Sequence, residues 1–307
     1  MFGLIADVEV DAAGNIFVLD DQTLAVRWFS PDGEFMGSAG GKGAGPGEFR
    51  APVGLTVDPA ENVQVLDMAF RRISVFQPTD SSFALVREMS TDIHALDMCL
   101  SHGRRYLLSP IDSLLVHEVN DSGSIVRSFG SIGGEPIPPE LEPHARMLLD
   151  SRARGRLLCD DADSSVVVVR EQTPLVQAFS LDGAPLWERD LEGFAERQWV
   201  AGTGRSGRPS LSMAPEPVTK SVHTTMAVAR VFGGHVAISL LRNSMEDLEG
   251  TLEVRVLSHD DGSTIASHQV ELVLAGVQGS LVYGFANAPF PRVFVLNGMP
   301  FPWRAYQ

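Results

Sequence analysis

Residues 8–29 read VEVDAAGNIFVLDDQTLAVRWF, and residues 55–76 read LTVDPAENVQVLDMAFRRISVF. The second stretch repeats the first 47 positions later along the chain. The matching residues fall at turns and at strand centres, and include Asp11 with Asp58, Asn15 with Asn62, Val18 with Val65, Leu19 with Leu66, Asp20 with Asp67, and Phe29 with Phe76. An internal repeat of this length is typical of repeat folds such as propellers.

Each repeat unit contains four strand-like segments. In the first unit, short apolar stretches at 8–10, 16–19, 24–29 and 34–38 are separated by turns rich in Gly, Asp and Asn. Such runs, bounded by turn residues, predict strands joined by tight turns. Four antiparallel strands that recur about every 40–50 residues form one blade of a β-propeller.

Weaker copies of the unit follow along the chain. We expect a third blade over residues 95–130 and a fourth that aligns on the second at an offset of 103, placing Asp161 on Asp58. A fifth spans 225–272, and a sixth begins at Gly279. The sequence therefore predicts an all-β fold: one domain over residues 1–307, a six-bladed propeller of four-stranded antiparallel blades.

The last predicted blade has only three strand-like segments, the third at residues 303–306. Propellers close their ring within one blade, which hides exposed strand edges. We expect the closing strand to come from residues before Phe2, and the natural gene product to be longer at its N-terminus. An export signal in that segment would make the protein extracytoplasmic. The alternative is a final blade of three strands.

The first two units resemble NHL repeats. The most specific stretch is residues 40–58, GGKGAGPGEFRAPVGLTVD, which is similar to the glycine-rich link and blade opening of that family. The resemblance covers residues 5–80 best and 95–190 less closely. The NHL family includes a lyase of peptidylglycine amidation, protein-interaction modules and sensor domains, so the resemblance implies a fold without implying an activity.

Two insertions interrupt the repeat. Residues 131–154 carry apolar side chains at helical spacing, which predicts a short helix between blades 3 and 4. Residues 191–221 are rich in Gly, Ser, Pro and Arg, which favours a long loop. Both insertions, like the 40–50 link, join an outermost strand to the next innermost strand. They should therefore emerge on one face, around the mouth of the central channel, and we expect the ligand there.

The sequence contains no convincing catalytic or cofactor-binding motif, so enzymatic activity is the less favoured hypothesis. We expect a scaffold that binds a protein, peptide or small ligand on the loop-rich face. The alternative is a metal-dependent lyase or hydrolase, since His94 and His223 precede inner strands near the channel mouth and His144 falls in the helix. These imidazoles would hold zinc or calcium. A third reading is a cell-surface sensor domain.

Arginines and cysteines complete the set of candidates. Arg50 is expected on the ligand face, and the arginines at 71, 72, 152, 154 and 156 are interpreted as solvated, with carboxylate recognition as the alternative. The two cysteines, Cys99 and Cys159, are interpreted as buried free thiols.

Charge and hydropathy limit the partners. The formal net charge of −15 disfavours nucleic acid as a partner. No run approaches the roughly 18 apolar residues of a membrane helix. We expect a monomer.

Overall fold

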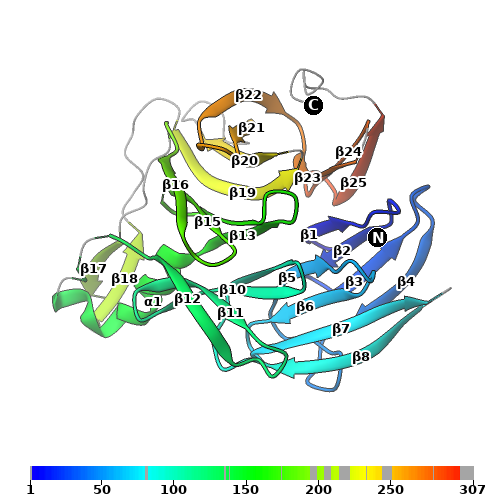
Figure 1. Ribbon diagram of the computed structural model, residues 1–307, viewed down its shortest axis with the longest axis horizontal. Coiled ribbons are helices and arrows are strands. Elements are labelled where there is room, and N and C mark those ends of the chain that lie inside the picture. The colour runs from blue at the N-terminus through cyan, green and yellow to red at the C-terminus, as the bar shows by residue number, and fades with distance from the viewer. Residues whose placement is uncertain are drawn as a thin grey trace.

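The computed structural model describes residues 2–79, 82–134, 136–137, 139–173, 175–193, 199–203, 209–213, 222–232, 234–243, 251–278 and 280–297. Six antiparallel sheets are arranged around a central axis as the blades of a propeller (Figure 1). The predicted all-β, six-bladed architecture is confirmed.

The first three blades have four strands each, numbered from the channel outward. Blade 1 contains β1 (Ile5–Val10), β2 (Ile16–Asp20), β3 (Ala25–Phe29) and β4 (Phe35–Gly40). Blade 2 contains β5 (Pro52–Val57), β6 (Val63–Asp67), β7 (Arg72–Thr79) and β8 (Ser82–Ser90). Blade 3 contains β9 (Asp97–Ser101), β10 (Arg104–Ile111), β11 (Leu114–Val119) and β12 (Ile125–Ser131).

The remaining blades follow two insertions. Blade 4 contains β13 (Gly155–Asp160), β14 (Ser165–Arg170), β15 (Leu175–Ser180) and β16 (Pro185–Asp190). Blade 5 contains β19 (Val222–Phe232), β20 (His235–Asn243), β21 (Thr251–Ser258) and β22 (Thr264–Val270). Blade 6 contains β23 (Val273–Gln278), β24 (Leu281–Ala286) and β25 (Arg292–Asn297).

The first strands of the six blades form the wall of the channel. Each of β1, β5, β9, β13, β19 and β23 contacts the first strand of the next blade, and β23 contacts β1. Blades 1 and 4 therefore lie on opposite sides of the channel. The core fills the gaps between neighbouring blades; Phe17, Phe49 and Phe76, for example, are buried between blades 1 and 2.

The repeated aspartates organise turns. The Asp20 carboxylate accepts hydrogen bonds from the backbone N–H groups of Gly3, Leu4, Gln22 and Thr23. Asp67, its counterpart in blade 2, accepts from those of Arg50, Ala51 and Phe70. Their recurrence in the sequence thus reflects turn geometry.

The helical insertion is confirmed. A 3-10 turn (Pro139–His144) leads into α1 (Ala145–Ala153), which packs against β10 between blades 3 and 4. In the part of the chain that the structure describes, no helix combines the length and apolarity needed to cross a bilayer.

The expectation of a featureless loop over residues 191–221 was wrong. A hairpin, β17 (Trp199–Thr203) with β18 (Pro209–Met213), lies within it. These short strands mix small and polar residues and so carry little periodicity in the sequence.

Blade 6 begins one strand earlier than predicted. Its inner strand is β23, whereas the sequence pattern predicts a blade that begins at Gly279. The error arose because only a two-residue bend, Glu271 and Leu272, separates β23 from the apolar end of blade 5. Three strands of blade 6 are described, and residues 303–306 lie outside the described residues. A closing strand upstream of Phe2 stays a prediction.

The two cysteines form a disulfide, so the expectation of free thiols was wrong. Cys99 lies in β9 and Cys159 in β13, the adjacent inner strands of blades 3 and 4. Their Cα atoms are 5.6 Å apart, within the range that a disulfide requires. The 60-residue separation in sequence hid this proximity, which only the ring arrangement creates.

Candidate functional site

Two hollows open on the loop-rich face where the sequence predicts the ligand site. In each blade, the start of the first strand and the turn between the second and third strands lie at the same edge of the sheet. This upper face also carries the links between blades and α1. One hollow lies at the mouth of the channel and the other lies beside α1.

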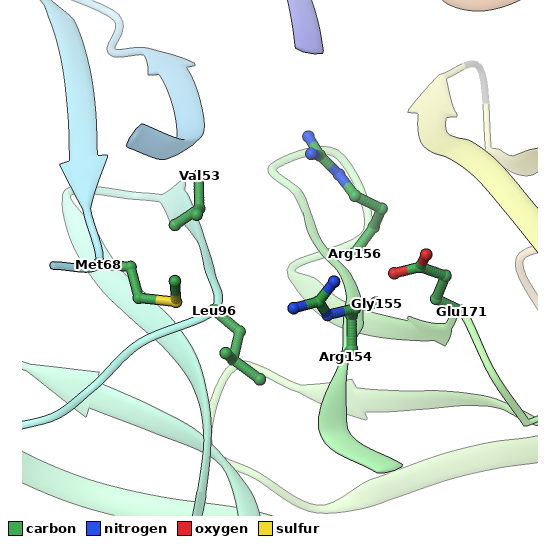
Figure 2. A pocket seen from close by; sticks show the side chains of 7 residues that line it. All are labelled: Val53, Met68, Leu96, Arg154, Gly155, Arg156 and Glu171. Carbon is green, nitrogen blue, oxygen red and sulfur yellow. The ribbon is translucent and has the colours of Figure 1, made fainter. Parts of the chain in front are cut away.

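The channel-mouth pocket has an apolar wall and a charged wall. Its volume is about 250 Å³. Figure 2 shows Val53, Met68 and Leu96 on one side and Arg154, Arg156 and Glu171 on the other. These residues come from blades 2, 3 and 4, so the pocket exists only where blades converge. An apolar surface facing a few placed charges is typical of small-ligand sites.

Arg154 is held at the rim by the end of the helix. Its backbone N–H donates to Asp150 O at 2.9 Å, which caps α1, and its carbonyl accepts from the N–H of Glu171 at 2.9 Å. The guanidinium is exposed, and no ion pair to it is found among the described residues. A fixed backbone therefore presents an available cation to the pocket.

An ion-pair network, called here the channel plug, closes the channel beneath this pocket. It consists of Asp7 on β1, Asp97 on β9, Arg156 on β13 and Arg230 on β19. Arg156 Nη2 lies 2.6 Å from Asp7 Oδ2, a bond between opposite blades, and Arg156 Nε lies 3.3 Å from Asp97 Oδ2. Arg230 binds the other oxygen of Asp7 and donates to Val8 O and Ala275 O, both at 2.9 Å. Side chains from four blades thus meet on the channel axis.

The two buried acids of the network, Asp7 and Asp97, differ in the direction of their pKa shifts. Burial opposes ionisation of Asp7, but Arg156 and Arg230 together hold its pKa below the usual value. Asp97 has less compensation: burial raises its pKa to about 6, and its Oδ1 atom is buried without a hydrogen bond. The neighbouring carboxylates, with Asp7 first, raise the pKa of Arg156 against the effect of burial. Arg156 therefore stays charged, while the pKa of Asp97 is about 6.

A further hollow lies on the other side of the plug. Its volume is about 280 Å³, and its lining includes Glu9, Arg230, Gln278 and Tyr283. Burial raises the pKa of Glu9 to about 7, which Arg230, 3.6 Å away, offsets only in part. Arg156 lines the upper pocket and Arg230 the lower one, so the plug separates two blind pockets.

The residues predicted from the sequence are spread over the upper face. His94 lines the hollow beside α1, a space of about 540 Å³ shared with Arg71, Asp92, Ser109, Arg146 and Asp150. Arg50 is exposed on the link between blades 1 and 2 and is not part of either lining. His223 lies in β19 opposite Arg242, and its side chain falls outside the described residues.

The predicted histidine metal site receives no support from the described residues. His144 ends the 3-10 turn before α1, and its Nε2 atom is buried without a hydrogen bond, as is His94 Nδ1. Neither His94 nor His144 belongs to a group of three metal-ligating side chains in the described part of the chain. These two imidazoles therefore do not make the donor set that a zinc or calcium ion would need.

The plug was missed in the sequence, although it left a signal. Asp7, Asp97 and Arg230 are charged residues inside apolar inner strands, where an ionised side chain requires a partner. Arg156 was interpreted as solvated, and this was wrong: its side chain is 15% exposed and paired twice. Sequence alone could mark each charge as unusual, but it could not show that four blades bring these charges together.

These features define the class: a six-bladed β-propeller with a closed channel and a pocket above the closure. The family model DUF5128, described as a 6-bladed beta-propeller, matches residues 1–114. No curated protein matches the chain.

Several solved structures share the fold at low sequence identity. A Bacteroides fragilis protein is similar at a TM-score of 0.60 and 11% identity, over 93% of this chain and 80% of that one. A member of the DUF4221 family from Bacteroides vulgatus gives 0.56 and 9%, over 96% and 94%. A Bacteroides caccae protein of unknown function gives 0.52 and 12%, over 87% and 82%. At these identities the likeness concerns the fold alone.

Proposed function

We propose that this propeller is a non-catalytic binding scaffold whose channel-mouth pocket takes a ligand with one carboxylate and one apolar group. A small molecule or the C-terminal residue of a peptide has this chemistry. The observation that carries the proposal is the pairing of an apolar wall with the available guanidinium of Arg154, above a channel that the plug closes. The resemblance of residues 5–80 to NHL repeats, whose family includes protein-interaction modules, supports a binding role.

The apolar wall sets the size of the ligand. Val53, Met68 and Leu96 are all partly exposed, so each has surface left to bury against a ligand. The volume of about 250 Å³ lies just below the range of roughly 300–1,000 Å³ that holds drug-sized molecules. A group of the size of one amino-acid residue fits this space.

The charged wall sets the ligand's charge. Arginine binds carboxylates through two parallel hydrogen bonds, and Arg154 is the exposed guanidinium at the rim. Arg156 is already paired with Asp7 and Asp97, so it attracts an anion through its charge more than through hydrogen bonds to the ligand. Glu171 would repel a second carboxylate. A monoanionic ligand is therefore favoured.

N-acetyl-leucine and its amide test the proposal as matched probes, because they differ only in the carboxylate. Calorimetric titration of the purified protein should show binding of the acid at least about tenfold tighter than the amide, since a charge-assisted bidentate pair is lost. Arg154→Gln should weaken binding of the acid about tenfold and leave the amide unchanged. Arg127→Gln, on the outer strand β12, is the control and should change neither affinity. Equal affinities for acid and amide on the wild type would contradict the proposal.

A further inference from the structure

We propose a binding site for a divalent transition-metal ion of the zinc class on the lower face, formed by Asp160, Asp163 and His259. One potential ligand atom from each of these side chains lies within 4.8 Å of the others. Asp160 ends β13 of blade 4, Asp163 lies in the turn that leads to β14, and His259 follows β21 in blade 5. The site lies away from the channel-mouth pocket and is independent of the proposed function.

The separation of two of the ligand atoms matches zinc geometry. His259 Nδ1 lies 3.3 Å from Asp163 Oδ2. Two ligands about 2.0–2.1 Å from a tetrahedral zinc ion are separated by about 3.3 Å. An ion can therefore bind both atoms without moving either backbone.

Asp160 has a carboxylate oxygen that the protein does not use. Its side chain is only 9% exposed. The Oδ1 atom accepts the N–H groups of Ala162 at 2.9 Å and Asp163 at 3.4 Å, which fixes the turn. The Oδ2 atom has no hydrogen bond from any described residue. This oxygen keeps access to solvent and is available to a cation, while burial of most of the side chain favours a positively charged partner.

The imidazole of His259 is held as metal-binding imidazoles usually are. Its Nε2 atom lies 2.6 Å from Ser165 Oγ, its backbone N–H donates to Gly234 O at 3.2 Å, and Trp187 Nε1 donates to its carbonyl. This contact at the second ring nitrogen fixes the orientation of the imidazole and leaves Nδ1 facing Asp163. The order Ser165, His259, Asp163 resembles a catalytic triad, but the fully buried Ser165 cannot meet a substrate.

The turn that supplies the two aspartates is fixed from blade 3 as well. The His102 ring nitrogen Nε2 contacts Asp161 O at 3.0 Å and Ser164 Oγ at 3.2 Å, and the His102 backbone N–H donates to Asp161 Oδ1 at 3.2 Å. The donor set is thus organised before an ion arrives, which reduces the entropic cost of binding.

The donor types select the class of ion. One imidazole and two carboxylates suit zinc and its neighbours, whereas calcium and magnesium take oxygen ligands almost alone. Asp163 is 40% exposed, so solvent reaches the site and a water can complete the coordination. The bound ion would join blades 4 and 5.

A zinc titration of the EDTA-treated, tag-free protein, in competition with a chromophoric chelator, tests this inference. We expect one equivalent of Zn²⁺ to bind. Asp163→Asn should weaken binding at least tenfold, because a partly exposed ligand is lost while the fold is kept. His259→Gln should abolish it. Asp161→Asn, which makes the same charge change in the same turn at a residue outside the donor set, should leave the affinity within twofold of wild type.

Thermal unfolding supplies a second readout. Zinc should raise the melting temperature of the wild type and of Asp161→Asn, and not that of Asp163→Asn. Without metal, Asp163→Asn should melt close to the wild type, because an asparagine oxygen can still accept a hydrogen bond from His259 Nδ1. Tenfold excess Mg²⁺ or Ca²⁺ should not displace the zinc. Absence of stoichiometric binding, or equal affinity of wild type and Asp163→Asn, would overturn the assignment. Displacement by calcium would overturn the choice of metal class.

Discussion

Arg156 Nη2 lies 2.6 Å from Asp7 Oδ2, and the two residues stand on the inner strands of opposite blades. The bond therefore spans the channel from blade 1 to blade 4. It makes the pocket above it blind and ties residues 149 positions apart in the chain. Stability and the shape of the candidate site therefore depend on the same contact.

Removal of the Arg156 cation should destabilise the protein strongly. In Arg156→Met, Asp97 loses the arginine that pairs with it, and Asp7 retains Arg230 as its arginine partner among the described residues. Both carboxylates are buried. Breaking a buried ion pair costs about 3–5 kcal/mol, and we expect the lower end because Asp97 can take up a proton. Denaturant unfolding measures the loss. The control Arg127→Met removes an arginine that is 40% exposed and paired with exposed Asp182, and should cost less than about 1 kcal/mol. Equal losses would show that the plug contributes no more than a surface pair.

Asp97 should make stability fall as the pH rises. The folded protein holds this proton up to a pKa of about 6, whereas the unfolded chain releases it near 3.8. Between these values the folded state binds more protons, so the free energy of unfolding decreases with increasing pH. Relative to Asp97→Asn, the wild type should lose up to about 3 kcal/mol between about pH 4 and pH 6.5.

Two other acids shape the same profile. The pKa of Glu9, raised to about 7 from 4.5, has the same sign and extends the decline toward neutrality. The lowered pKa of Asp7 acts oppositely: its contribution is present above 3.8 and is lost in more acid solution. If the free energy of unfolding changes with pH in the same way for the wild type and for Asp97→Asn across this range, the raised pKa of Asp97 is refuted.

The disulfide should form without added catalyst when the protein is purified in the absence of reductant. We expect no free thiol on titration of the denatured chain, since both cysteines are paired. The Cys99→Ser/Cys159→Ser double variant should lose up to about 4 kcal/mol, the loop-closure value for a 60-residue separation. Two titratable thiols would contradict the pairing.

Asn287 should matter for ring closure. Its side-chain carbonyl accepts the N–H of Ile5 and its amide donates to Ile5 O, both at 2.9 Å, which joins blade 6 to blade 1. Asn287→Ala leaves both backbone groups of the buried Ile5 unpaired at this edge and should cost about 1–2 kcal/mol. Asn297→Ala, at the exposed end of β25, should stay within about 0.5 kcal/mol of wild type. A larger loss for Asn297→Ala would argue against this closure.

The fold could be predicted because its signals are local. Turn aspartates such as Asp20 and Asp67 recur at the repeat length, and the strand between two turns is short and apolar. The blade count and the helix followed from these patterns. The start of blade 6 did not, because a bend of two residues between apolar strands leaves almost no polar signal.

The site could be predicted only as a face. Links between blades must emerge on one side, so a loop-rich face at the channel mouth could be predicted from the sequence. The partners of Asp7 and Asp97, and the Cys99–Cys159 bond, depend on which blades are adjacent or opposite across the ring. His259 could not be predicted as a ligand from the sequence, because the aspartates beside it, Asp160 and Asp163, belong to another blade.

A crystal structure of the protein bound to N-acetyl-leucine tests the proposed ligand site at the channel mouth. We expect the carboxylate within hydrogen-bond distance of the Arg154 guanidinium, the leucyl side chain against Val53, Met68 and Leu96, and the Asp7–Arg156 bond intact beneath it. Ligand bound in the hollow beside α1, or a channel-mouth pocket that stays without ligand at saturating concentration, would contradict it.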